Sequence, residues 1–69
     1  METQKWNNLI EEHYSSACKV NPEYSKKHSR EEMKDWWYNL LSKRPEKDIE
    51  DFIVGSIWSN NHNIFYHPV

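Results

Sequence analysis

The sequence predicts an all-α fold, a small three-helix domain with an extended C-terminal segment packed across it. Apolar residues recur at helical spacing in three segments, and helix-boundary signals separate these segments. The 69 residues allow one domain, residues 1–69. A chain of this size buries only about 60% of the surface of its unfolded form, so its core must depend on a few bulky rings. A two-helix arrangement or an obligate dimer is the structural alternative.

The first helix is expected over about residues 3–20. Its apolar stripe has period 3.6 and consists of Trp6, Leu9, Ile10, His13, Ala17 and Val20. Thr3 is a suitable N-cap. Asn21-Pro22 ends the helix, because proline disfavours a helical conformation in the residue before it. Residues 22–28 show no periodicity and are expected to form a loop.

The second helix is expected over residues 30–43, after a capping box in which Ser29 and Glu32 satisfy each other's backbone amides. It contains three consecutive aromatic residues, Trp36-Trp37-Tyr38. Successive helical side chains diverge by about 100°, so one core-facing stripe has no room for all three. Trp37 is expected in the core, Trp36 at its edge and Tyr38 facing away.

The third helix is expected over residues 46–59, where Pro45 ends the preceding helix or begins this one. Val54 and Trp58 fall opposite its apolar face and are neighbours on the helix surface. Gly55 beside them costs about 1 kcal/mol relative to alanine, which indicates either close approach of another backbone or ligand, or a tolerated accident. The tail, residues 60–69, is expected to pack over Val54 and Trp58.

The predicted core combines the central residues of the three apolar faces. It comprises Trp6, Leu9, Ile10, Ala17, Met33, Trp37, Leu40, Ile49, Phe52, Ile53 and Ile57.

Composition and charge argue against several classes of protein. The single cysteine, Cys18, excludes an internal disulfide, and a cytoplasmic location is expected. The N-terminal residues do not resemble a signal peptide, and no stretch approaches the roughly 20 apolar residues that span a bilayer. The net charge of -2 gives no global attraction for phosphate or anionic lipid.

Residues able to bind metals or catalyse reactions occur without the patterns that such chemistry requires. The candidates are His13, Cys18, His28, His62 and His67. His62 and His67 have the spacing of a zinc-finger half-site, but the paired cysteines are absent. Cys18 has no neighbouring base in sequence, and the paired carboxylates lie at helix starts or on solvated faces. We therefore expect no metal, no cofactor and no enzymatic activity.

Protein recognition is the function that the sequence favours, because tryptophan and tyrosine are enriched at binding hot spots. The predicted partner-binding residues are Tyr38, Trp36, Val54, Trp58, Phe65 and Tyr66. The chain is expected to bind a larger protein through this aromatic surface and to modulate or inhibit it, as small phage or bacterial regulators do.

Two alternatives remain open at this stage. Tyr24, Lys26, Lys27 and Arg30 interleave an aromatic ring with basic groups, which suits stacking on bases and contact with phosphates. Against major-groove recognition, the third helix would approach DNA with the acidic run that starts at Glu46. The other alternative is a homodimer in which surface aromatics pair between copies.

Overall fold

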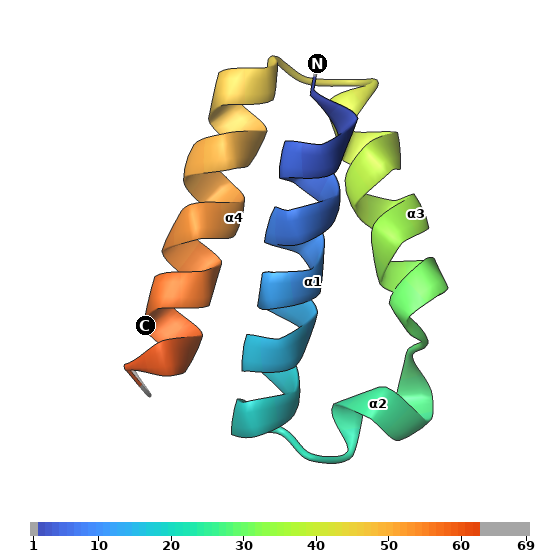
Figure 1. Ribbon diagram of the computed structural model, residues 1–69, viewed down its shortest axis with the longest axis vertical. Coiled ribbons are helices and arrows are strands. Elements are labelled where there is room, and N and C mark those ends of the chain that lie inside the picture. The colour runs from blue at the N-terminus through green and yellow to red at the C-terminus, as the bar shows by residue number, and fades with distance from the viewer. Residues whose placement is uncertain (1, 63–69) are drawn as a thin grey trace, which may run out of the picture.

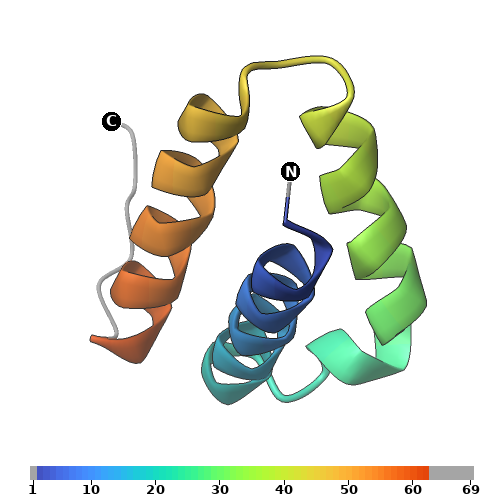
Figure 2. The same cartoon turned by 45° about the horizontal axis from the view of Figure 1, so that its top comes forward.

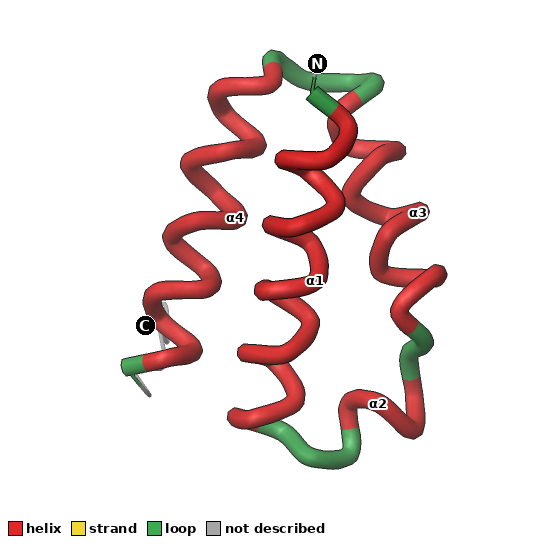
Figure 3. Tube along the Cα trace, in the orientation of Figure 1, coloured by secondary structure: helices red, strands yellow, loops and turns green. Residues whose placement is uncertain are grey.

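The computed structural model describes residues 2–62, which form the helices α1 (Thr3–Val20), α2 (Tyr24–Lys27), α3 (Arg30–Leu41) and α4 (Glu46–Asn61). The long helix α1 lies between α3 and α4 (Figure 1). At one end of the molecule α2 leads from α1 into α3, and at the other end residues 42–45 join α3 to α4 (Figure 3). No strand occurs within residues 2–62, so the all-α prediction is confirmed. The predicted packing of the tail beyond His62 lies outside the described residues.

The helix boundaries depart from the prediction in places. The helix α1 begins at Thr3, but the N-cap position is Glu2 and its side chain makes no capping hydrogen bond. The segment 22–28, predicted as a loop, contains the single turn of α2, which follows a hydrogen bond from the Glu23 amide to Asn21 Oδ1. At its end α4 continues to Asn61, two residues further than predicted.

The start of α3 confirms half of the predicted capping box. The Ser29 hydroxyl accepts a hydrogen bond from the Glu32 amide at 3.1 Å. The Glu32 carboxylate lies 3.1 Å from His28 Nδ1, so it contacts the side chain of the residue that precedes the N-cap Ser29. The helix ends at Leu41, two residues earlier than predicted, and Pro45 occupies the N-cap position of α4.

The core consists of three rows of side chains in which neighbouring residues are four apart. The rows are Trp6, Ile10 and Tyr14 on α1, Met33 and Trp37 on α3, and Ile49, Ile53 and Ile57 on α4. Residues spaced by four form the ridges that helices use to pack against one another. Leu9 and Leu40 are partly buried around these rows, as is Ala17.

Tyr14 is a buried residue that the sequence reading missed. It is four residues after Ile10 and continues the same row. Its hydroxyl donates a hydrogen bond to the His28 carbonyl at 2.7 Å, which satisfies the polar end of a ring that is otherwise in the core. A tyrosine at the end of an apolar row can therefore be buried when a backbone carbonyl lies within reach.

Trp6 anchors α1 to the beginning of α4. Its side chain is completely buried, and its indole N–H donates a hydrogen bond to Glu46 Oε1 at 2.6 Å. Glu46 lies in the first turn of α4, where a carboxylate also interacts favourably with the helix dipole. One turn further along α4, Glu50 pairs with Lys5 at 2.6 Å on the surface, and the hydrogen bond to this carboxylate raises the pKa of Lys5.

We predict that Glu46→Ala lowers the free energy of unfolding by about 1–3 kcal/mol, because the buried indole N–H loses its acceptor. Glu46→Gln keeps an acceptor oxygen and should cost less. Asp48→Ala is the matched control, since it removes a carboxylate from the same first turn. Urea denaturation followed by circular dichroism measures all three, and equal losses for Glu46→Ala and Asp48→Ala would contradict the role of the indole bond.

Candidate functional site

The three consecutive aromatics of α3 have different environments. Trp37 is buried, and the edge of one indole ring of the Trp36–Trp37 pair meets the face of the other, with centroids 4.9 Å apart. Trp36 itself is 49% exposed. The prediction that Tyr38 faces away from the core is wrong, because its ring is partly buried and its hydroxyl donates to Asn7 Oδ1 at 2.7 Å. The length of a tyrosine side chain allows it to reach α1 from the flank of α3, so the Tyr38 hydroxyl links these two helices.

Phe52 was predicted in the core, and this prediction is also wrong, since its side chain is 52% exposed. It occupies the flank of the α4 apolar face, where the ring touches Trp37 with centroids 5.3 Å apart. Both α3 and α4 pack on α1, and among the described residues neither covers the outer side of this ring. Phe52 and Trp36 are therefore the exposed rings between these two helices.

These two rings stand on the rim of a hollow surface between α3 and α4, which we call the α3–α4 groove. It has two adjoining parts of about 430 and 400 Å³, and both are lined by Trp36 and Phe52. The first part is completed by Leu40, Arg44, Asp48 and Ile49. The second part is completed by His13, Tyr24, His28, Glu32, Met33, Trp37 and Ser56.

The groove is apolar in its interior and charged at its ends. Its floor includes the core residues Met33, Trp37 and Ile49, so an occupant would contact the hydrophobic core directly. Arg44 and Asp48 line one part, whereas Glu32 and His28 line the other. Such a surface can bury apolar side chains and pair with a charged group at either end.

His13, which belongs to the predicted apolar stripe of the first helix, lies in the wall of the groove. Its ring meets Trp37 edge to face, with centroids 5.2 Å apart. Its Nδ1 atom is buried and has no hydrogen-bond partner among the described residues. Burial disfavours the charged imidazolium and lowers the pKa of His13.

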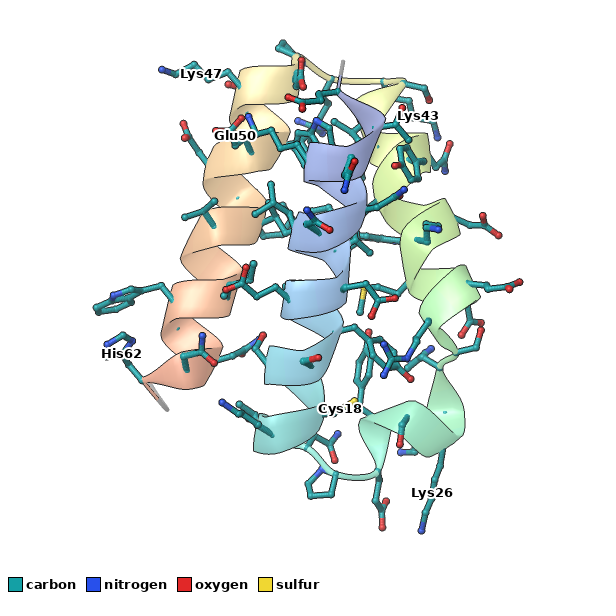
Figure 4. All side chains as sticks on the ribbon, in the orientation of Figure 1. Cys18, Lys26, Lys43, Lys47, Glu50 and His62 are labelled. Atoms are coloured by element: carbon teal, nitrogen blue, oxygen red, sulfur yellow. The ribbon has the colours of Figure 1, made fainter. Side chains whose placement is uncertain are left out.

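Two more of the predicted contact residues, Val54 and Trp58, lie on the other flank of α4. Val54 and Trp58 are 48% and 54% exposed, in agreement with their predicted position. The Trp58 ring stacks on His62 with centroids 4.3 Å apart, and His62 projects from the side of α4 remote from α1 (Figure 4). A shallower hollow of about 280 Å³ here also includes Leu9. Phe65 and Tyr66 lie outside the described residues.

The predicted partner-binding residues therefore do not form one surface. Trp36 belongs to the α3–α4 groove, Tyr38 to the α1–α3 packing, and Val54 with Trp58 to the far flank of α4. Phe52, which the sequence reading had assigned to the core, joins Trp36. Its position at the edge of the α4 stripe was the signal that could have identified it.

The basic patch proposed for nucleic acid is partly used by the fold. The Tyr24 ring packs edge to face against Tyr14, and burial raises the pKa of the Tyr24 hydroxyl. Arg30 pairs with Glu11 and lies 5.2 Å from the centroid of the Tyr14 ring. Lys26 and Lys27 are exposed, and Lys26 extends away from α2 (Figure 4). The predicted patch therefore offers two exposed lysines beside a partly buried Tyr24 ring.

The histidines and Cys18 are also dispersed. His28 contacts Glu32, His62 stacks on Trp58, and Cys18 is a half-buried free thiol near the end of α1. Within residues 2–62 no group of three or more histidine, cysteine, aspartate or glutamate side chains is arranged to hold a metal ion. His67, the second member of the predicted histidine pair, lies outside this range.

The lowered pKa of His13 predicts a pH dependence of stability. Above the unfolded-state pKa of about 6.5, His13 is neutral in both states. As the pH falls below this value, the unfolded chain binds a proton that the folded chain resists, so the free energy of unfolding decreases. Urea denaturation at pH 7.5 and 5.5 should show a smaller decrease for His13→Gln than for the wild type. His62→Gln is the control, and a decrease that His13→Gln leaves unchanged would contradict this assignment.

Two further findings bear on the class of the protein. No helix within residues 2–62 combines the length and the apolar character needed to cross a membrane. Comparison of the chain with protein-family models, with curated proteins and with solved structures finds no match. The function of the chain is therefore inferred from the geometry of the described residues.

Proposed function

We propose that this chain is a small non-enzymatic protein that binds a larger protein through the α3–α4 groove and modulates that partner. The observation that supports this most directly is the pair of half-exposed rings, Trp36 and Phe52, on the rim of a groove whose floor is the core. Large aromatic residues beside a preformed apolar hollow are the usual components of binding hot spots.

The shape of the groove favours an amphipathic helix as its occupant. The groove runs between two helices, and the shorter, α3, has 12 residues and is therefore about 18 Å long. A partner helix of that length presents apolar side chains at i, i+3 or i+4, and i+7, which matches an apolar trough. Arg44 and Asp48 at one part of the groove, and Glu32 at the other, offer charges for residues at the ends of such a helix.

The mode of action follows from size. A chain of 69 residues can modulate a partner by covering a functional surface of that partner, and this needs only area and fit. No catalytic group is required for such an effect. The far flank of α4, with Val54 and Trp58, takes no part in this proposal.

We predict that Trp36→Ser reduces capture of the partner at least roughly 30-fold, the loss expected for removal of a hot-spot side chain worth about 2 kcal/mol. The immobilised protein is incubated with a nuclease-treated lysate of the cells that encode it, and bound proteins are quantified by mass spectrometry. Phe52→Ser should have the same effect, because it removes the ring on the opposite rim.

Trp58→Ser is the matched control, since it removes an equally exposed tryptophan from the other flank of α4. Circular dichroism establishes that each variant is folded. A partner that Trp36→Ser captures as well as the wild type, and that Trp58→Ser loses, would place the contact on the far flank and contradict the groove.

A further inference from the structure

The helix α4 is apolar around more of its circumference than the fold uses. Ile53 and Ile57 pack into the core, whereas Phe52, Val54 and Trp58 are each about half exposed. Exposed apolar side chains that gather on one surface mark a site of interaction with another molecule. Among the residues that the structure describes, α1 and α3 cover only one side of α4, as the view in Figure 2 shows.

Gly55 lies at the centre of the uncovered side. A Cβ atom built at this position has no heavy atom within 4 Å among the described residues. The packing of the chain therefore does not require a glycine here, although glycine in a helix interior costs about 1 kcal/mol relative to alanine. The absence of a side chain allows another helix to approach the backbone of α4 closely at this point.

The residues around Gly55 are complementary to a second copy of themselves. In an antiparallel crossing with a two-fold axis at Gly55, each residue a given number of positions before Gly55 lies level with the residue the same number of positions after it. Phe52 and Trp58, three positions away on either side, then flank the contact between the two helices. Because both rings are half exposed, the crossing covers aromatic surface of both copies.

The charges agree with the same arrangement. Asp48 is seven positions before Gly55 and His62 is seven positions after it, so the carboxylate of one copy meets the imidazole of the other. Asp51, four positions before Gly55, faces the hydroxyl of Ser59. A parallel crossing would instead place Asp48 against Asp48 and Asp51 against Asp51, which like-charge repulsion disfavours.

We infer that the uncovered side of α4 is a self-association surface, on which two copies of the chain cross antiparallel at Gly55. This dimer lies beyond the proposed binding of a larger protein. It shares Phe52 and Asp48 with the rim of the groove, whereas Gly55 lies outside the groove lining and Trp36 lies outside the dimer surface. One helix from each copy forms a small interface, so the dimer is weak and assembles reversibly with concentration.

Sedimentation equilibrium of the wild-type chain from micromolar to millimolar concentration tests this inference. A reversible monomer–dimer equilibrium is expected, and Gly55→Gln should raise its dissociation constant at least tenfold, because a long side chain now separates the two backbones. The same variant should unfold at higher urea concentration, since glutamine is the better helix former. Trp36→Ser is the control and should leave the equilibrium unchanged.

The orientation has its own test. His62→Glu places carboxylates opposite Asp48 and should weaken the dimer, whereas His62→Glu combined with Asp48→Lys places opposite charges at both ends and should restore association. A wild-type chain that stays monomeric at millimolar concentration, or a Gly55→Gln variant that dimerises like the wild type, would overturn the surface. A charge-exchanged double variant that stays as weak as His62→Glu would overturn the antiparallel crossing.

Binding of a partner in the groove and dimerisation through α4 can be tested independently of each other. Gly55→Gln should still capture the groove partner, and Trp36→Ser should still dimerise. Loss of capture in Gly55→Gln together with unchanged dimerisation would show that the outer side of α4 binds the partner instead of a second copy, and would overturn this inference.

Discussion

The structure depends on the position of α1 between α3 and α4. Its row of Trp6, Ile10 and Tyr14 is the surface against which the other helices bury their own rows. Trp6 supports this arrangement at one end through Glu46, and Tyr14 supports it at the other through the His28 carbonyl. With a single helix in the middle of so short a chain, α3 and α4 have an inner side that is packed and an outer side that, within residues 2–62, is not.

Both candidate binding surfaces follow from that constraint. Between α3 and α4 the open space becomes the groove, because each helix turns its core row towards α1 and leaves Trp36 or Phe52 on the rim. On the outer side of α4, the same geometry leaves Gly55 without a neighbour among the described residues and Trp58 half exposed. The aromatic residues within 2–62 are thus divided between two environments, the small core and the exposed surface.

Periodicity was sufficient to predict the long helices and most of the core, because a row of residues spaced by four is visible in the sequence itself. It was insufficient for residues at the edges of a stripe. Phe52 and Tyr38 have similar flank positions, yet Phe52 is exposed while Tyr38 reaches Asn7 on α1. Which flank is covered depends on the placement of neighbouring helices, and the groove, which is built from several helices, was for the same reason beyond prediction.

The fold encloses Trp6 and Trp37 and leaves Trp36 and Trp58 about half exposed at the surface. The most direct test labels the four tryptophans with fluorine and measures their fluorine NMR line widths in a soluble paramagnetic agent, with resonances assigned by single Trp→Phe substitutions. In dilute protein, the signals of Trp36 and Trp58 should broaden, whereas those of Trp6 and Trp37 should stay sharp. A Trp36 signal as protected as that of Trp37 would contradict an open α3–α4 groove and the proposed binding of a partner there.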